Sequence, residues 1–372
     1  MVAISACKTP HERSRFEKVA EDLHSGDPAY IPPYPGSIAR YLASDSAFHQ
    51  RHGEILPLIA TRNGRAVGRI AAIINRSHNA QYGDRTGFFG FFECENDPET
   101  ARALFERAAE ILRSRGLQGI RGPYNPSIND ECGLLVEGFE HAPFIGLTWN
   151  PAYYEALVSA QGFHPVCTSF GLQLPLHRLA PPERLKRIVD RVARRSRLKL
   201  RPIKLERLED ELKIVLEVYN DTLKRNWGFV PITMEDLLFA ADDLRAIADP
   251  EMILIAEQDG QNAGVGLSLP NFNELLALTK KTPRWLRPLH ILWLMKTRPI
   301  RSGRQVVYGI SPRFRDRGLH GWLLYEQFVC AKARYENAEL GWIEDTNTEI
   351  LDNSVMLGGE RHRTWKIFEK AL

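Results

Sequence analysis

The sequence has few cysteines, no long apolar run and little net charge, and each of these absences excludes a class of protein. The five cysteines among 372 residues are scattered without a C-x-x-C pair, so neither a disulfide framework nor a metal site is expected, and a reducing cytoplasm is the expected location. No apolar stretch approaches the roughly 18 residues that cross a bilayer, and the N-terminal residues lack the apolar core of a signal peptide. The net charge of +3 is too small to indicate a nucleic-acid partner.

The composition that remains is ordinary for a globular protein, with 26% charged and 44% hydrophobic residues. The chain is longer than one hydrophobic core comfortably supports, so two domains are expected. The composition changes around residues 179–182, which places the domain boundary near residue 180. We therefore expect one domain over residues 1–180 and a second over residues 181–372.

The stretch from Gln305 to Ala333 combines an apolar strand, a basic turn and a helix. The strand covers residues 306–310, the turn carries Arg315 and Arg317 and ends at Gly318, and the helix has an apolar stripe. A helix N-terminus presents unpaired N–H groups and the positive end of the helix dipole, so this turn suits a phosphate group. From spacing alone, a basic loop that binds no ligand is an equal alternative.

This stretch resembles the acyl-CoA-binding motif of the GNAT acyltransferase superfamily, R/Q-x-x-G-x-G/A, in the segment Arg315-Asp-Arg-Gly318-Leu-His320. His320 stands where the pattern has a small residue. The preceding strand, the helix that the motif opens and a second strand ending in Asn347 follow the family's order. The resemblance implies an α/β fold with a mixed sheet and acyl-CoA as co-substrate, with no metal. The residues it assigns to CoA are Tyr308, Gly309, Ile310, Ser311, Arg315, Arg317, Gly318 and Asn347.

The first half of the chain has the same order of elements. A hairpin around Asn63-Gly64, a strand over residues 87–95 and a helix capped by Asp97 are followed by another strand. Two tandem GNAT-like domains with little sequence identity are therefore expected. The acidic residues Glu93, Glu95 and Asp97 occupy the place of the phosphate turn, where they would repel a pyrophosphate. We expect that only the second domain binds acyl-CoA.

Two segments combine apolar and basic residues. The insertion over residues 271–304 of the second domain contains Trp285 and Trp293 between lysines and arginines. It fits either a helix that covers the domain core or a surface that contacts an anionic membrane. The arginine-rich helix expected over residues 183–196 leaves a similar choice between a solvated face and contact with anionic lipid.

An amine attacks a thioester only in its neutral form. With a pKa near 10, roughly one amine in a thousand is neutral at pH 7, so a general base is expected. Glu344, on the strand after the binding turn, is the preferred base, and His320 is the second candidate. Ser354 stands where the family has a tyrosine acid, so no general acid is assigned. The residues expected to contact the acceptor are Trp227, Phe229, Asn271, Asn273, Asn129 and Asp130, although Asn129 and Asp130 also fit a capped turn.

The whole chain is similar to a group of bacterial double-GNAT proteins that includes the bacterial ceramide synthases. The similarity lies in the layout and in the stretches GFFGFFECEND, RGPYNPSINDECG and NWGFVPI. It implies transfer of a long-chain acyl group from acyl-CoA to the amine of a sphingoid-base-like lipid, with peripheral contact at the inner membrane. The alternatives are acetyl transfer from acetyl-CoA to a small soluble amine and an inactive CoA-binding partner protein.

Overall fold

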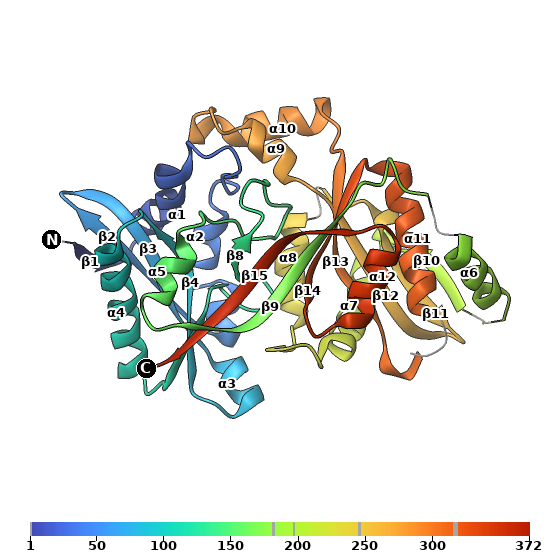
Figure 1. Cartoon of the computed structure of the whole chain (residues 1–372), viewed down its shortest axis with the longest axis horizontal. Coiled ribbons are helices and arrows are strands. Elements are labelled where there is room, and N and C mark those ends of the chain that lie inside the picture. The colour runs from blue at the N-terminus through green and yellow to red at the C-terminus, as the bar shows by residue number, and fades with distance from the viewer. Residues whose placement is uncertain (1, 181–182, 196–197, 245–246, 315–318) are drawn as a thin grey trace. The chain divides into compact units, whose positions relative to one another are not determined.

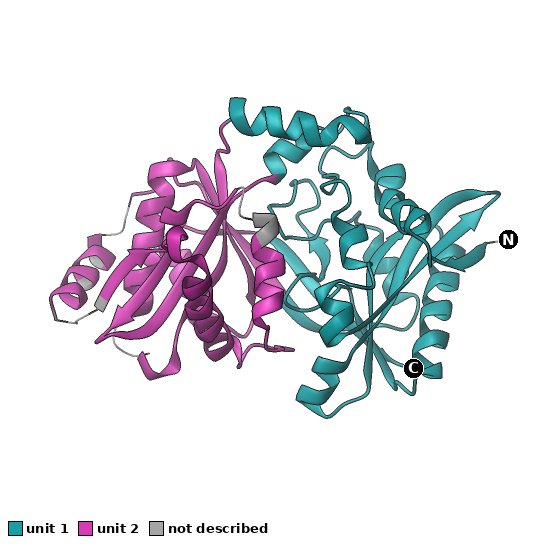
Figure 2. Ribbon diagram, turned by 180° about the vertical axis from the view of Figure 1, so that it is seen from behind, with its two compact units in different colours: residues 1–168, 273–298, 363–372 teal, residues 169–272, 299–362 magenta. Residues whose placement is uncertain are grey.

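The computed structural model describes residues 2–180, 183–195, 198–244, 247–314 and 319–372. The chain forms two compact units, drawn in teal and magenta in Figure 2. Unit 1 comprises Met1–Thr168, Asn273–Arg298 and Arg363–Leu372, and unit 2 comprises Ser169–Phe272 and Pro299–His362. The boundary between the units lies between Thr168 and Ser169, whereas the sequence places it near residue 180. The inserted segment over residues 273–298 belongs to unit 1, although the sequence groups it with the second domain.

Unit 1 is built on a sheet with the strand order β1-β2-β3-β4-β5-β15, and β8 also pairs with β15. Neighbouring strands are antiparallel except β4 and β5, which are parallel. The strands are β1 (Ala3–Ala6), β2 (Gly53–Arg62), β3 (Arg65–Asn75), β4 (Thr86–Cys94), β5 (Gly119–Gly122), β8 (Leu134–Glu137) and β15 (Glu360–Ala371), with β6 (Tyr124–Asn125) and β7 (Glu131–Cys132) forming a separate pair. The helices are α1 (Pro10–His24), α2 (Ser37–Tyr41), η1 (Phe48–His52), α3 (Arg76–Tyr82), α4 (Pro98–Ser114), α5 (Tyr154–Ser159), α9 (Asn273–Leu278), η4 (Arg284–Leu286) and α10 (Arg287–Thr297).

Local signals account for the main elements of unit 1. Asn63 and Gly64 adopt φ values of 51° and 80° between β2 and β3, so the expected hairpin is confirmed. Asp97 caps α4 by accepting the backbone N–H of Thr100 at 3.0 Å, and Pro98 follows in the first turn. The apolar face of α4 then packs on the sheet, where Leu104 and Leu112 are fully buried.

Unit 2 repeats this arrangement with the strand order β9-β14-β13-β12-β11-β10. Here β13 and β14 are the parallel pair, and the other neighbours are antiparallel. The strands are β9 (His164–Leu174, from residue 169 in this unit), β10 (Leu198–Pro202), β11 (Ile253–Gln258), β12 (Gln261–Pro270), β13 (Ser302–Ile310) and β14 (Asn337–Glu344). The helices are α6 (Glu183–Arg195), η2 (Leu205–Arg207), α7 (Leu208–Leu223), α8 (Met234–Leu244), η3 (Pro250–Met252), η5 (Pro312–Phe314), α11 (Leu319–Arg334) and α12 (Thr348–Met356).

In both units, three antiparallel strands lead into a helix and then into a strand that is parallel to the third (Figure 1). The helix is α4 in unit 1 and α11 in unit 2. This repeat confirms the expected α/β fold with mixed sheets. Each unit also contains a strand segment from the other half of the chain. Residues 364–366 pair with β8, residues 368–371 pair with β5, and residues 169–174 pair with β14.

Helices α7 and α11 cover opposite faces of the sheet of unit 2. Ile255 and Val265 on one face pack with Val215 and Val218 of α7. Alternate residues of the same strands belong to the other face, where Ala256 packs with residues of α11. The two faces can therefore be discussed separately when the site is built.

Among the residues that the structure describes, no helix combines the length and the apolar character needed to cross a bilayer.

Candidate active site

Strands β13 and β14 of unit 2 pair at one end and separate at the other. Their ladder runs from Ser302 opposite Asn337 to Gln305 opposite Leu340. Beyond these residues, β13 continues to pair with β12 and β14 resumes its pairing with β9. The edges that residues 306–310 and 341–344 turn toward each other therefore border a gap rather than a ladder.

Backbone N–H groups of β13 point into this gap. Ser311 donates its backbone N–H to the carbonyl of Ala263 at 2.9 Å. This bond fixes the directions in which the N–H groups of the preceding residues point. Backbone groups alternate in direction along a strand, so Gly309 also turns toward β12, while Tyr308 and Ile310 turn toward the gap. Within the backbone expected over residues 308–311 to bind CoA, the N–H group of Tyr308 is thus turned toward the gap.

Glu344 ends β14 and contacts the loop that follows α7. Its two carboxylate oxygens accept the backbone N–H of Trp227 at 3.2 and 3.3 Å. Burial raises the pKa of Glu344, and the nearby Asp345 raises it further, against the hydrogen bonds from Trp227 and Thr346. A half-buried carboxyl with a raised pKa is suited to accept a proton from an amine. Glu344, the expected base, is therefore in direct contact with Trp227, one of the residues expected to contact the acyl acceptor.

Phe229 lies in the same loop and is buried, with its ring 6.2 Å from the ring of Tyr219 on α7. Its side chain supports the loop from beneath. The loop over residues 226–229 is therefore fixed at both of its aromatic positions, by Glu344 at Trp227 and by α7 at Phe229.

His320 and Tyr308 lie on the face of the sheet that α11 covers. The Tyr308 hydroxyl donates to the backbone carbonyl of His320, and their rings are 5.7 Å apart. Burial raises the pKa of Tyr308 above its usual range. Glu344 contacts the loop after α7, on the opposite face, so the structure separates the two candidate bases. Tyr308 instead anchors the first turn of α11, directly after the expected phosphate turn.

The residues expected to hold the pyrophosphate, Arg315, Arg317 and Gly318, lie outside the described residues. The structure describes both sides of this turn, with η5 ending at Phe314 and α11 beginning at Leu319. The strand, turn, helix and strand thus occur in the expected order.

Several other expected site residues have structural partners in unit 2. Asn347 caps α12 by accepting the backbone N–H of Ile350 at 3.4 Å, and β14 ends earlier, at Glu344, rather than at Asn347. Ser311 donates its hydroxyl to Asp221. A Cβ atom on Gly309 would lie 2.1 Å from Cγ2 of Thr222, so this glycine permits the close approach of α7.

The remaining expected acceptor residues are divided between the units. Asn271 is buried in unit 2 and donates to the Ser302 hydroxyl at 3.1 Å. Asn273 begins α9 in unit 1 and donates to the carbonyl of Pro143 at 2.9 Å. Asn129 and Asp130 form a polar turn in unit 1, in which Asp130 accepts the Ser127 hydroxyl at 2.6 Å. The structure therefore groups Trp227 and Phe229 near Glu344, whereas Asn273, Asn129 and Asp130 belong to the other unit.

The comparisons with known proteins cover the whole chain. The bacterial ceramide synthase of Caulobacter vibrioides is 30% identical over 377 aligned positions, which cover 100% of this chain and 98% of the relative. The chain belongs to the bacterial ceramide synthase family. It is an N-acyltransferase. Protein YghO of Escherichia coli is 29% identical over 96% of this chain and 92% of that protein.

The solved structures agree on the fold. A tandem GNAT protein from the clavulanic acid biosynthesis pathway superposes with a TM-score of 0.58 over 100% of this chain and 98% of its own, at 13% sequence identity. The expected tandem GNAT architecture is thereby confirmed. No protein-family model matches the chain. Within the described residues, no cluster of three or more His, Cys, Asp or Glu side chains could hold a metal ion.

In this member of the ceramide synthase family, a second carboxylate lies on β14 near the start of the gap, and the sequence analysis missed it. Glu339 is fully buried, and its Oε2 lies 2.5 Å from Nε2 of His362. On the neighbouring strand, opposite Glu339, the buried Arg304 donates to the carbonyl of Gly341 at 2.8 and 3.0 Å. A charged residue inside an otherwise apolar strand was the available signal for Glu339, but its partner is 23 positions away in sequence.

The corresponding gap in unit 1 of this family member is filled by protein. Strands β4 and β5 are parallel only from Thr86 to Phe88. Beyond them, the Asn125 side chain accepts the backbone N–H of Phe91 at 2.6 Å, and a Cβ atom on Gly90 would lie 1.5 Å from the carbonyl of Tyr124. The segment Tyr124–Asn125 thus lies against β4, next to the end of the parallel pairing.

The three acidic residues at the place of the phosphate turn, Glu93, Glu95 and Asp97, are each paired with a basic side chain. Glu95 and Asp97 both form ion pairs with Arg62. Glu93 is paired with Arg69 at 3.3 Å and lies 3.1 Å from His24. The negative charges of these three carboxylates are therefore balanced locally.

Proposed function

We propose that this N-acyltransferase moves a long-chain acyl group from acyl-CoA to the amine of a sphingoid-base-like lipid. The observation that carries the proposal is the full-length similarity, at 30% identity, to a protein named bacterial ceramide synthase. The gap between β13 and β14, with the backbone N–H of Tyr308 turned into it, supports acyl-CoA as the acyl donor. Acyl-CoA would lie with its thioester between these strands and its pyrophosphate at the start of α11.

The reaction needs one proton acceptor and one oxyanion site. The amine nitrogen forms a bond to the thioester carbon while its proton passes to Glu344, directly or through water. The N–H group of Tyr308 would stabilise the negative charge on the thioester oxygen. The carbon–sulfur bond then breaks, and the CoA thiolate takes a proton from solvent, since the buried Ser354 donates its hydroxyl to the carbonyl of Ile350 at 2.7 Å and supplies no acid.

A sphingoid base is a lipid and reaches the enzyme from a membrane. This acceptor therefore implies peripheral contact with an anionic membrane, which in a bacterial cell is the inner membrane.

The proposal predicts amide formation from sphinganine and acyl-CoA. Purified full-length protein should convert sphinganine with long-chain acyl-CoA into a ceramide, measured by mass spectrometry across acyl lengths from acetyl to long-chain. Acetyl transfer to a small soluble amine, with no amide from sphinganine at any acyl length, would support the alternative substrate instead. The variant Glu349→Gln serves as the matched control for Glu344→Gln, because Glu349 is an exposed carboxylate on α12, five positions after Glu344.

The assignment of the phosphate turn predicts loss of CoA binding when its arginines are removed. Wild-type protein should gain about 2.7 kcal/mol of stability when CoA is present at about 100 times its Kd, measured as a rise in Tm. The double variant Arg315→Ala with Arg317→Ala should lose this rise. The neighbouring Arg313, which lies in η5 and is 3.9 Å from Glu217, provides the control Arg313→Ala. An unchanged rise in the double variant would show that CoA binds elsewhere.

A further inference from the structure

The segment over residues 273–298 exposes large apolar side chains on the surface of unit 1. Trp285 is 78% exposed, Leu289 is 64% exposed and Trp293 is 54% exposed, and Leu278 and Leu292 are exposed to a similar degree. Isolated exposed apolar residues are common, but a contiguous group of this size marks an interaction surface.

Helix α10 has apolar residues on two faces, which explains why part of them stays outside. Ile291 and Leu294 are buried and hold the helix on unit 1. Leu289, Leu292 and Trp293 are spaced by three and four positions, so they share the opposite, outward face. Trp285 lies one turn earlier, in η4. One face of α10 therefore covers the core of unit 1, which agrees with one of the two interpretations of the sequence. The apolar residues of the other face are exposed.

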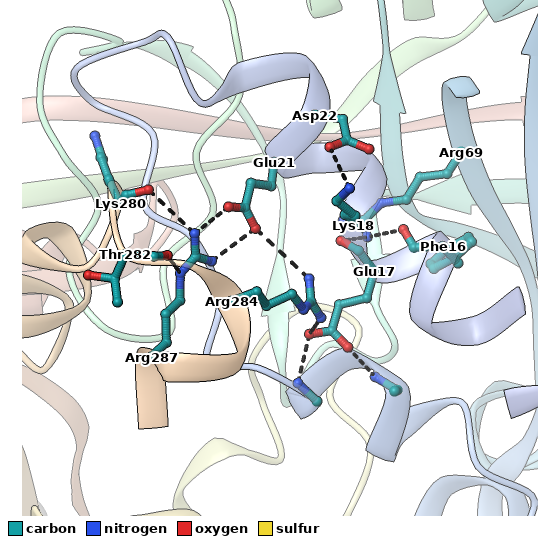
Figure 3. A network of polar contacts seen from close by, with 12 residues as sticks. Phe16, Glu17, Lys18, Glu21, Asp22, Arg69, Lys280, Thr282, Arg284 and Arg287 are labelled. Carbon is teal, nitrogen blue, oxygen red and sulfur yellow. Dashed lines mark hydrogen bonds and ion pairs between the residues drawn. The ribbon is translucent and has the colours of Figure 1, made fainter. Parts of the chain in front are cut away.

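Two buried ion pairs fix this segment on α1, as Figure 3 shows. Arg284 is 2.6 Å from Glu17, a carboxylate that is 1% exposed. The buried Arg287 donates to Glu21 at 2.9 Å and to the carbonyl of Thr282 at 3.1 Å. These arginines are used inward, within the fold. The outward apolar face is consequently held in place before any partner arrives, which lowers the entropy lost on docking.

Three other basic residues of the segment are turned outward, whereas Lys280 donates to the carbonyl of Pro28 at 2.6 Å. Lys281, Lys296 and Arg298 are exposed. Residues 275–304 contain no aspartate or glutamate, so the charge along this stretch is of one sign. Tryptophans beside leucines, bordered by unopposed basic residues, match the interface of a bilayer that contains anionic lipids.

We propose that this surface, the docking face, binds an anionic lipid bilayer. It is defined by Leu278, Trp285, Leu289, Leu292 and Trp293 together with Lys281, Lys296 and Arg298. The apolar side chains enter the headgroup region and the basic side chains contact lipid phosphates. The inference rests on the proposed function in one respect, because docking would bring the enzyme to the membrane that holds a lipid acceptor.

Vesicle flotation of the full-length protein tests the docking face. The vesicles are phosphatidylcholine alone and phosphatidylcholine mixed with phosphatidylglycerol. Wild-type protein should float with the mixed vesicles, and the triple variant Trp285→Ser, Leu289→Ser and Trp293→Ser should bind them at least about tenfold more weakly. The variant Lys281→Gln, Lys296→Gln and Arg298→Gln should lose about fivefold for each charge removed on mixed vesicles and little on phosphatidylcholine alone.

Matched controls separate this face from general surface effects. Leu205 and Val355 are exposed apolar residues of unit 2, so Leu205→Ser with Val355→Ser should leave flotation unchanged. Arg187, Arg191 and Arg194 are exposed on α6, the other basic segment, and their replacement by glutamine should have little effect. Loss of binding in the α6 variant with retention in the docking-face variants would overturn the proposal. So would a docking-face variant that changes only the oligomeric state measured by sedimentation.

Flotation requires no catalysis, so docking and activity can fail separately. A protein that binds mixed vesicles but forms no amide would keep the docking face and remove the proposed function. A protein that forms amide from detergent-dispersed substrate but does not bind vesicles would support the proposed acyl transfer and contradict the docking face. Docking-face variants should keep their rate on dispersed substrate while losing it on sphinganine presented in vesicles.

Discussion

Replacing Glu344 by glutamine is expected to lower kcat by about 100-fold or more, in the range of a lost general base. The amide of glutamine keeps an oxygen that can accept the backbone N–H of Trp227, so the loop after α7 retains its contact. Only the ability to take the amine's proton is removed. Rates should be measured with acyl-CoA and detergent-dispersed sphinganine so that membrane binding does not enter the result.

The pH profile distinguishes a base from a structural carboxylate at this position. Because burial raises the pKa of Glu344, wild-type kcat should increase with pH through a limb above the usual glutamate value of about 4.3. The Gln variant should lack this limb. Asp345→Asn should move the limb to lower pH, since Asp345 is one cause of the raised pKa.

Stability provides the counter-test for Glu344. A carboxyl with a raised folded-state pKa stabilises the fold below its unfolded-state pKa, and this contribution is lost as pH rises through the folded-state value. Above the folded-state pKa the ionised Glu344 therefore gives no such stabilisation, and in that pH range Glu344→Gln should unfold at the same or a higher urea concentration. A fall in kcat that parallels a fall in stability, with an unchanged pH profile, would contradict the assignment of Glu344 as the base.

Short-range patterns were sufficient to predict much of the fold. The turn at Asn63-Gly64 and the cap at Asp97 are set by residues next to them in sequence, and both occur where expected. The order of strand, turn, helix and strand around residues 302–344 is likewise set by local apolar periodicity. Glu344 and Trp227 were both proposed for the site, but their direct contact joins residues 117 positions apart.

Long-range pairing explains what the sequence did not predict. The assignment of residues 363–371 to the sheet of unit 1 depends on their pairing with β8 and β5, which local propensity does not encode. The family resemblance assigns Asn347 to CoA, and in the structure its side chain caps α12. To predict the pair formed by Glu339 and His362, one would have to know which strands are neighbours in the sheet.

Replacing Glu93 by glutamine is expected to destabilise unit 1 by about 3–5 kcal/mol, the cost of removing one partner of a buried ion pair. Arg69 is 3% exposed, and its remaining hydrogen bonds in this region go to the carbonyls of Phe16 and Glu17. Its charge would then be buried without a carboxylate. Tyr154 donates to Glu93 at 2.8 Å and would lose a charged acceptor as well.

The pH dependence of this loss has a definite sign. Burial alone would raise the pKa of Glu93, but the hydrogen bond from His24, the charge of Arg69 and the hydrogen bond from Tyr154 together lower it. A lowered folded-state pKa means that the carboxylate stabilises the fold above its unfolded-state pKa of about 4.3, and that this stability is lost as pH falls through the folded-state value. The difference in urea midpoint between wild type and Glu93→Gln should be constant near neutral pH and should become smaller at acid pH.

Glu95→Gln is the matched control, two positions away. Glu95 is paired with Arg62 at the surface, where one ion pair contributes about 0–1 kcal/mol. Equal losses in the two variants would mean that the buried network around Glu93 is no stronger than a surface pair.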